Sequence, residues 1–524
     1  MILRHGVHFV RLSAGCLAIL FSTSGLLSAQ TPTVSVVSPQ GLTPGQTVPV
    51  KISGGNLAGA TQLWTSFPTT SQLSTATPDN GKQPNEVTFD VTVPADAAPG
   101  VHGLRLVTDK GVSPLKLIVV EPFPVVVHNN QNKTQDTAQE VPVPCTIEGH
   151  IDNLSRVYYR FKAGADQQIS FEVQARRLGS PLDPMLRLFD ASGRELAWSD
   201  DEAGLQGDSR FAYRFATAGD YAIELSDVRY QGSGNHRFRL RIGEFPLVTT
   251  PYPMVVQVDR PTSLAFAGEE VEPTTAIQNL TIPNIPGLSP GGELWMPIAA
   301  GTSGFSLLGV SSTPQFDETE PNNTAEQANR VELGTSLNGR FQEPRDVDRF
   351  VFAAKAGQKY RFTAITRQAG SPADLQLQFF KPDGGKLAEI DDVGLEDSSF
   401  DFNSPADGDY TLVVKDLHEH GGPQFTWHVK VEPIKTSFLL TSSAETLNVP
   451  VGGILPVSVQ SQRKGYNGSI KIEARNLPAG FESLPTWIGP GRNDAVLTIR
   501  TGKDAAAGSL AEIQIVGSAE IDGA

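Results

Sequence analysis

Apolar and polar residues alternate in short runs along most of the chain. Clear examples are residues 87–93 (VTFDVTV), 169–173 (ISFEV) and 425–431 (FTWHVKV). Successive side chains of a strand point to opposite faces, so each run has one apolar face to bury and one polar face to expose. The pattern predicts an all-β protein whose sheets pack in pairs as β-sandwiches.

Turn-forming residues separate these runs. The 524 residues include 50 Gly and 38 Pro, a density that disfavours long helices and favours many short strands joined by turns. The chain is also several times longer than a typical domain, so we expect a string of separate modules.

A long internal repeat marks two of these modules. Residues 179–183 (GSPLD) recur as 370–374 (GSPAD), and 218–221 (AGDY) recur as 407–410 (DGDY), at nearly constant spacing. A repeat of this length indicates two copies of one domain rather than a solenoid of short units. We expect the Gly-Asp-Tyr element to turn into a strand, with its Tyr packed inward and the hydroxyl hydrogen-bonded.

The second copy carries the motifs of a known family. Residues 318–324 (ETEPNNT), 346–350 (DVDRF), 356–358 (AGQ) and 408–410 (GDY) resemble the bacterial pre-peptidase C-terminal (PPC) domain in order and spacing. The resemblance implies a jelly-roll-like β-sandwich of the kind found on secreted peptidases and many surface proteins. We expect this domain over 316–434 and a degenerate copy over 121–243.

Smaller modules flank the two copies. Residues 38–41 (SPQG), 45–47 (GQT) and 54–57 (GGNL) resemble bacterial immunoglobulin-like modules of surface proteins, which implies such a sandwich over 31–120. Strand-like runs also predict a β-rich connector over 244–315 and another immunoglobulin-like sandwich over 435–524. That last module ends abruptly after a strand-like run, so we expect the natural chain to be longer.

The first 29 residues have the composition of a secretory signal. Two arginines lead into an apolar stretch over 12–27, and small residues follow at 28–29. The stretch is too short and interrupted for a membrane span, and no later one is apolar enough, so we expect a secreted, periplasmic or cell-surface protein. Lipid attachment at Cys16 is the alternative. Signal removal leaves only Cys145, which we expect to be a buried hydrophobe rather than a nucleophile.

The net charge of −15, from 42 basic and 57 acidic side chains, narrows the partners. Nucleic-acid binding depends on neutralising phosphates with Lys and Arg, so this balance argues against it. Cation binding fits an acidic chain better.

The best candidate site is a calcium site in the second copy. Calcium takes six to eight oxygen ligands from carboxylates, amides and carbonyls. One short acidic segment crowds oxygen side chains together, and two aspartates at i and i+2 of the next extended stretch share a face. In collagen-binding relatives of the family, the matching acidic segment binds calcium. The predicted ligands are Glu318, Glu320, Asn322, Asn323, Asp346 and Asp348; the alternative interpretation is a solvated acidic linker.

The first copy lacks these ligands. Its corresponding segment, residues 130–134, reads NQNKT, so Lys133 brings a cation where an oxygen ligand is needed. Ser155 and Val157 replace the two aspartates, although Asp152 is nearby. We therefore expect no calcium at this position of the first copy.

Other motifs carry less chemistry. Residues 418–420 (HEH) offer two zinc ligands without an evident third, so we expect an exposed loop. Residues 287–291 (GLSPG) match a nucleophile elbow, but Pro290 breaks the helix that such an elbow needs. Trp198, Tyr213 and Tyr230 could form an aromatic platform for a polymer, with a core role preferred for Tyr213. The repeated acids predict either a second cation site or, preferably, solvated turns: Asp200, Asp201, Asp208, Asp391, Asp392 and Asp397.

These observations predict a secreted or cell-surface protein that binds or spaces and has no catalytic residues of its own. Its PPC domains would bind an extracellular protein or polysaccharide polymer, with Ca²⁺ stabilising the second copy. The rival interpretation is the accessory region of a longer secreted peptidase or other hydrolase whose catalytic domain lies outside this chain. A purely structural envelope component is a third possibility.

Overall fold

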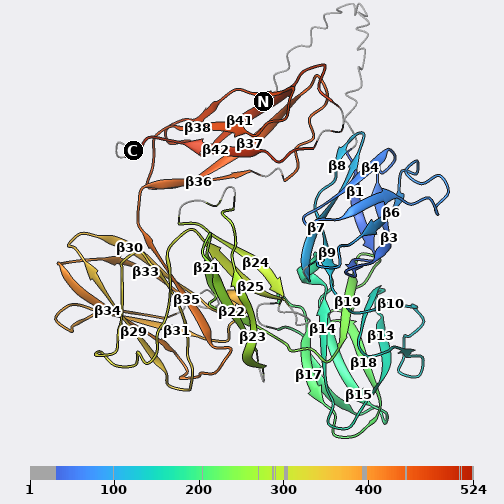
Figure 1. The fold of residues 1–524 in the computed structure, drawn as a ribbon, viewed down its shortest axis with the longest axis horizontal. Helices are drawn as coiled ribbons and strands as arrows, with labels where there is room; N and C mark the ends of the chain where they lie inside the picture. Colours follow the sequence, from blue (N-terminus) through green and yellow to red (C-terminus); the bar gives the residue numbers. More distant parts are fainter. Residues whose placement is uncertain are drawn as a thin grey trace, which may run out of the picture.

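The structure is a computed structural model that describes residues 31–97, 99–202, 205–268, 271–285, 288, 291–299, 305–391, 398–442, 445–506, 508 and 510–521. The signal predicted over 1–29 lies outside the described residues. Regular structure within them consists of strands and two single-turn 3₁₀ helices, η1 (Arg176–Leu178) and η2 (Arg367–Ala369). The prediction of an all-β, multidomain fold of β-sandwiches is confirmed (Figure 1).

The first unit, called the N-terminal sandwich, packs sheet β1-β3-β6-β5 against sheet β2-β9-β7-β4, with β8 beside β7. The alternating run over 87–93 lies in β6 and points Val87, Phe89 and Val91 into the core. The strands are β1 (Thr33–Ser38), β2 (Gly41–Leu42), β3 (Thr47–Gly55), β4 (Ala60–Thr65), β5 (Thr70–Leu73), β6 (Glu86–Thr92), β7 (Gly100–Thr108), β8 (Gly111–Val112) and β9 (Lys116–Val120).

The second unit, sandwich A, has two five-stranded sheets in the orders β10-β12-β19-β14-β17 and β11-β13-β18-β15-β16. Its core is aromatic and aliphatic, and Phe161, Phe171 and Phe215 meet at its centre. The strands are β10 (Val125–Val127), β11 (Gln139–Glu140), β12 (Cys145–His150), β13 (Arg156–Ala163), β14 (Gln168–Gln174), β15 (Pro184–Asp190), β16 (Glu195–Ser199), β17 (Arg210–Arg214), β18 (Gly219–Asp227) and β19 (Arg237–Gly243).

Sandwich B, further along the chain, repeats this architecture. Its sheets run β26-β28-β35-β30-β33 and β27-β29-β34-β31-β32, which is the strand order of sandwich A. The strands are β26 (Gln315–Asp317), β27 (Asn329–Val331), β28 (Ser336–Arg340), β29 (Val347–Ala354), β30 (Lys359–Ile365), β31 (Leu375–Phe380), β32 (Lys386–Ile390), β33 (Ser399–Asn403), β34 (Gly408–Asp416) and β35 (Thr426–Pro433).

The Gly-Asp-Tyr turns behave as the sequence predicts in both sandwiches. Tyr221 is buried and its hydroxyl donates to the Thr217 carbonyl at 2.7 Å. Tyr410 is buried and donates to the Ala406 carbonyl at 2.8 Å. Each Tyr lies opposite a core Phe of the neighbouring strand, Phe161 or Phe352, which fixes the equivalent register of the two sandwiches.

A smaller connector sandwich lies between them. It pairs sheet β20-β22-β23 with sheet β21-β25-β24 over a core that includes Phe266 and Leu308. The strands are β20 (Thr250–Tyr252), β21 (Val255–Gln257), β22 (Thr262–Gly268), β23 (Val271–Leu280), β24 (Glu293–Ala299) and β25 (Phe305–Ser311).

The last sandwich pairs sheet β36-β37-β41-β39 with sheet β40-β38-β42, and it contacts the N-terminal sandwich (Figure 1). Arg105 of β7 forms an ion pair with Glu445 at 2.8 Å, and Asn448 exchanges two hydrogen bonds with the Val112 backbone. The strands are β36 (Ser437–Ser442), β37 (Ile454–Lys464), β38 (Ile470–Arg475), β39 (Phe481–Ser483), β40 (Thr486–Ile488), β41 (Asp494–Thr501) and β42 (Gln514–Ser518).

Candidate metal centre

Three carboxylates meet at one end of sandwich B, between its two sheets. Glu318 and Glu320 lie on the segment that follows β26, and Asp348 lies in β29. Within β29 the side chains of Asp348, Phe350 and Phe352 share the buried face, so Asp348 is a carboxylate on the core side of a strand. One carboxylate oxygen from each of the three acids falls within 4.8 Å of the others.

Protein donors hydrogen-bond to only one of the two carboxylate oxygens of Glu318 and to only one of those of Asp348. Glu318 Oε1 accepts from the Arg340 amide at 2.7 Å and from Gln342 Nε2 at 3.0 Å, while Asp348 Oδ2 accepts from Trp427 Nε1 at 3.0 Å. The second oxygens, Glu318 Oε2 and Asp348 Oδ1, are buried without a hydrogen-bond partner. Buried polar atoms usually have a partner, and a cation or a donor group between these two oxygens would supply one.

The electrostatics of the cluster point the same way. Burial, opposed in part by hydrogen bonds from Arg340 and Gln342, raises the pKa of Glu318 to about 8. Burial, and then the charge of Glu318, raises the pKa of Asp348 well above its usual value. The pKa of Glu320 is also raised, mainly by burial. Like charges out of water disfavour one another, and a bound cation would remove that penalty.

The other predicted ligands surround this cluster. Asn322 is fully buried, and its Nδ2 has no hydrogen-bond partner. Asp346 is buried but already bonded, since its Oδ2 accepts from the Gln342 amide at 2.7 Å and its Oδ1 from the Val347 amide. With its amide nitrogen turned toward Asp346, Asn323 donates to Asp346 Oδ1 at 3.0 Å. Asp346 and Asn323 therefore bond to each other and to backbone rather than joining the three-acid group.

Sequence reasoning missed two side chains at this site. Trp427 fixes Asp348, and Gln342 fixes Glu318 and places a buried, unpartnered Oε1 beside it. The strand pairing explains the Trp: Gly339 of β28 lies opposite Trp427 of β35. A Cβ at Gly339 would come within 2.0 Å of the Trp427 ring and 2.5 Å of Glu318 Oε2, so a glycine in this strand is the one signal that the sequence offered.

The equivalent end of sandwich A has a different chemistry. Lys133 Nζ donates to Asn130 Oδ1 at 2.6 Å and lies 3.2 Å from Asp152 Oδ2. Val157, fully buried in β13, stands where sandwich B has Asp348. His128 packs among aromatic rings here, and burial lowers its pKa to about 4. The ammonium group of Lys133 thus lies between the side-chain oxygens of Asn130 and Asp152.

The acidic cluster lies beside the junction with the connector sandwich. The guanidinium of Arg340 stacks 5.2 Å from the centre of the Tyr252 ring in β20. Asn338 of β28 forms two hydrogen bonds with the Val255 backbone, at 3.1 and 3.0 Å. On the neighbouring strand, fully buried His428 contacts Glu293 of β24 at 3.2 Å. A change in the conformation of the acidic cluster can therefore alter the contact between sandwich B and the connector sandwich.

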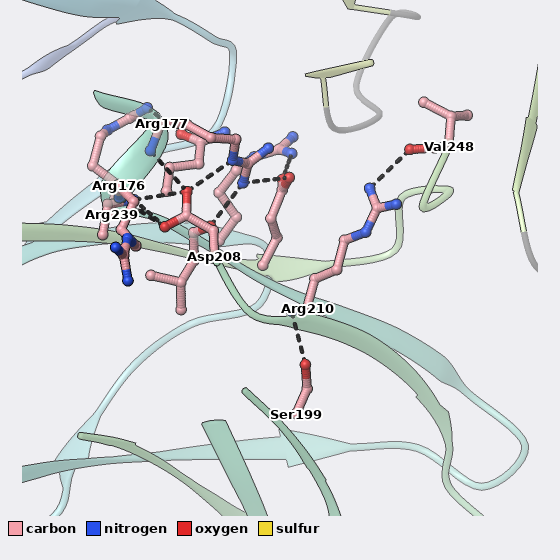
Figure 2. A network of polar contacts seen from close by, with 12 residues as sticks. Arg176, Arg177, Ser199, Asp208, Arg210, Arg239 and Val248 are labelled. Atoms are coloured by element: carbon pink, nitrogen blue, oxygen red, sulfur yellow. Dashed lines mark hydrogen bonds and ion pairs between the residues drawn. The ribbon is translucent and has the colours of Figure 1, made fainter. Parts of the chain in front are cut away.

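Asp208 corrects an interpretation of the repeated acids. It is neither solvated nor part of an open cation site, because it is fully buried and its carboxylate accepts from the Ala175 and Arg176 amides (Figure 2). It also pairs with Arg177 at 2.8 Å. Asp200 is half-buried and Asp201 is exposed, whereas Asp392 and Asp397 lie outside the described residues.

That pairing belongs to a larger buried ion network on the outer face of sheet β10-β12-β19-β14-β17. Arg239 pairs with Glu121 and Glu148, and Arg241 pairs with Glu121 and Glu172. Burial by itself would raise the pKa of Glu172, but the surrounding arginines outweigh it and hold that pKa at about 2. Figure 2 also shows Arg210 donating to the Val248 carbonyl of the connector.

The other motifs noted in the sequence lie in a core, on a turn or on the surface. Cys145 is fully buried in β12, as predicted, and burial raises the pKa of its thiol to about 12. His418 and His420 are exposed on the turn after β34. Tyr213 packs against the core of sandwich A, whereas Trp198 is exposed. Most of the 287–291 motif lies outside the described residues.

The comparisons with known proteins identify one domain. Residues 346–416 match the family described as bacterial pre-peptidase C-terminal domain. A protein of Deinococcus radiodurans named "Probable subtilase-type serine protease" is 37% identical over 111 residues. Those residues are 21% of this chain and 15% of that protein, so the chain spans a small fraction of the length of this curated relative.

Solved structures align with parts of the chain at low similarity. The pre-peptidase C-terminal domain of collagenase from Bacillus anthracis aligns with 22% of this chain and all of its own length, at 15% identity and a TM-score of 0.17. A Bacteroides ovatus mixed-linkage glucan utilisation protein aligns over 74% of both chains, at 10% identity and a TM-score of 0.16. Among the described residues, none of the helices has the length and apolarity to span a membrane.

Proposed function

We propose that this chain is a calcium-stabilised, non-catalytic binding or spacing region of a secreted or cell-surface protein. The observation that carries the proposal is the group of half-buried Glu318, exposed Glu320 and buried Asp348, in which one buried oxygen of Glu318 and one of Asp348 lack partners. The match of residues 346–416 to the pre-peptidase C-terminal domain family supports the non-catalytic role.

Calcium is the cation that suits this donor set. The oxygens come from carboxylates and amides without nitrogen or sulfur ligands, which favours a hard cation. Three carboxylates that ionise when a cation binds favour a divalent ion over a monovalent one. Glu318, Glu320 and Asp348 would bind the ion directly, and Gln342 Oε1 would complete part of the shell.

The bound ion would stiffen the junction with the connector sandwich. Glu318 follows directly on β26, the first strand of sandwich B, and its neighbour Arg340 stacks on Tyr252 of the connector. By neutralising the carboxylates, the ion would hold the segment that follows β26 in place between the two sheets. The sandwiches would then keep a fixed relative orientation, which a protein that presents binding faces to an extracellular polymer needs.

Calcium titration into the full-length chain tests this proposal. We expect calorimetry to detect one high-affinity Ca²⁺ per chain after chelation, and Ca²⁺ to protect β28 and β29 from hydrogen exchange. The double variant Glu318→Gln/Asp348→Asn should lose both effects. Glu326→Gln, a change at an exposed carboxylate of the same segment, should retain both. Absence of Ca²⁺ binding to the wild-type chain would remove the calcium part of the proposal.

The polymer partner needs a separate experiment. Full-length chain with and without Ca²⁺ would be incubated with collagen, chitin and bacterial cell-wall fractions, and the bound fraction measured by sedimentation. Retention on one polymer supports a binding role, and its loss after chelation would connect binding with the metal site. Retention on none of them would favour the purely structural role.

The second candidate is the accessory region of a longer secreted peptidase. The 37% identity over 111 residues to a subtilase-type protein favours it. The complete reading frame decides between the two: a catalytic domain encoded in the same frame would establish the accessory role. A frame that encodes none would leave the binding or spacing role.

A further inference from the structure

A narrow cleft lies where the N-terminal sandwich meets sandwich A. One wall comes from β1 and β9, and the other from β14, η1 and the start of β19. Figure 1 shows β9 above β19 and β14 at this junction. Its polar lining includes Ser35, Lys116, Gln174, Ser180, Asn235 and Arg237.

The cleft is cationic in an acidic protein. Lys116 and Arg237 both line it, and none of the described residues in its lining is acidic. Neither side chain has a hydrogen bond or ion pair with another group in the described part of the chain. The nearby Glu148 carboxylate is already engaged, since it accepts from the Gly41 amide at 2.7 Å and from Arg239 Nε at 2.8 Å.

A buried donor without a partner completes the set. Gln174 is 2% exposed, and its Oε1 accepts from Arg239 Nη1 at 2.9 Å, which fixes the orientation of the amide. Its Nε2 is buried and has no hydrogen-bond partner, and Gln174 is one of the residues that line the cleft. A buried N–H without an acceptor is destabilising, so this group needs an acceptor.

Burial also acts on the arginine. It lowers the pKa of Arg237, although the charge of Glu148 opposes the effect. A guanidinium that loses hydration without gaining a carboxylate is destabilised, and an anion in the cleft would restore its partner.

The size of the cleft limits the ligand. Its volume is about 60 Å³. A single oxyanion group fits this space. The donors are a guanidinium, an ammonium, an amide and hydroxyl groups, which suit oxygen acceptors.

We infer that this cleft is an oxyanion-binding site, in which Arg237, Lys116 and Gln174 Nε2 bind a sulfate, phosphate or carboxylate group. The group is either a free ion or a substituent on an acidic extracellular polymer. Because both sandwiches supply donors, the bound anion also connects them. The site is distant in the chain from the metal centre of sandwich B and does not depend on calcium.

Calorimetry on the full-length chain tests the inference with sodium sulfate, sodium phosphate and sodium D-galacturonate as probes. Ionic strength is held constant with sodium chloride, and D-galactose serves as the uncharged control. We expect saturable binding of one anion per chain, with or without calcium. The probe that binds most tightly identifies the class: sulfate or phosphate, or the carboxylate of a uronate.

Two variants and a matched control locate the binding. Arg237→Gln and Lys116→Gln should each weaken anion binding by about tenfold or more, because each removes a charged donor. The exposed double variant Arg229→Gln/Lys162→Gln should bind as the wild type does. Hydrogen exchange of β14 and β19 without anion shows whether each variant keeps its fold. Lack of saturable binding by all three probes, or unchanged affinity in both folded cleft variants, overturns the inference.

Discussion

Neutralising Glu318 should stabilise the metal-free protein and abolish its response to calcium. In Glu318→Gln, the side-chain carbonyl can still accept from the Arg340 amide, as Glu318 Oε1 does at 2.7 Å. The variant therefore keeps the local geometry. What it removes is a carboxylate charge held out of water beside Asp348.

The magnitude follows from the pKa of Glu318, which burial raises to about 8. Between the usual value of about 4.5 and this value, the folded state binds more protons than the unfolded state. The contribution of Glu318 to the stability of the metal-free wild type is therefore fully present below about pH 4.5. It is lost as the pH rises to about 8. At about 1.36 kcal/mol per pH unit, the loss from this group reaches at most ~5 kcal/mol.

Hydrogen exchange of the full-length chain at pH 5 and pH 8 measures this effect locally. This choice avoids a single melting temperature, which is poorly defined for a chain of several sandwiches. At pH 8 with chelator, amides of β28 and β29 should exchange more slowly in Glu318→Gln, by up to ~10³-fold. At pH 5 the two proteins should differ much less, because Glu318 is then largely protonated.

Calcium should reverse this ranking at pH 8. The ion protects the wild type, whereas the variant has lost a charged ligand and gains little. Equal exchange of β29 in the two metal-free proteins at pH 8 would refute the assigned electrostatic penalty. Undiminished calcium protection in Glu318→Gln would refute the ligand role of this residue.

Three further changes test other parts of the fold. Glu148→Ala leaves Arg239 short of a buried partner and removes the acceptor for the Gly41 amide. The free energy of unfolding should fall by ~3–5 kcal/mol, which hydrogen exchange would detect as faster exchange of β12 and β19. Glu140→Ala, at an exposed carboxylate, is the control. Normal exchange in the variant would contradict this. Tyr410→Phe removes the hydrogen bond to the Ala406 carbonyl and should cost ~1 kcal/mol in the opening of β34; an unchanged opening free energy would show that the tether contributes nothing. Cys145, whose thiol pKa burial raises to about 12, should resist a disulfide reagent at pH 8 until the chain is unfolded; rapid labelling of the native protein would exclude a buried thiol.

Local patterns accounted for the strands and for the repeat. Alternation over 87–93 predicts which side chains of β6 are buried, because burial in a strand depends on a period of two residues. The repeated Gly-Asp-Tyr turns predict two sandwiches of equal topology, and Tyr221 and Tyr410 have the same inward, tethered position. Such features depend on neighbours along the chain.

The candidate site was predictable only in part. The acidic segment that begins at Glu318 is contiguous, so its oxygens stand out in the sequence, and Lys133 marks the copy that lacks them. Trp427 and Gln342 gave no comparable signal. Trp427 lies far along the chain and reaches Asp348 only because β35 pairs with β28 across from Gly339.

The amino-acid sequence by itself determined the all-β class, the repeat and one acidic segment, because periodicity and turn chemistry act over a few residues. Tertiary structure alone decided that Asp208 is buried against Arg177, that the last sandwich returns to the first, and that Lys116 and Arg237 face one cleft. The physical reason is that the surroundings of a charge are set by strands distant in the chain. Whether a carboxylate is solvated, paired or poised for a cation depends on which strands pack around it.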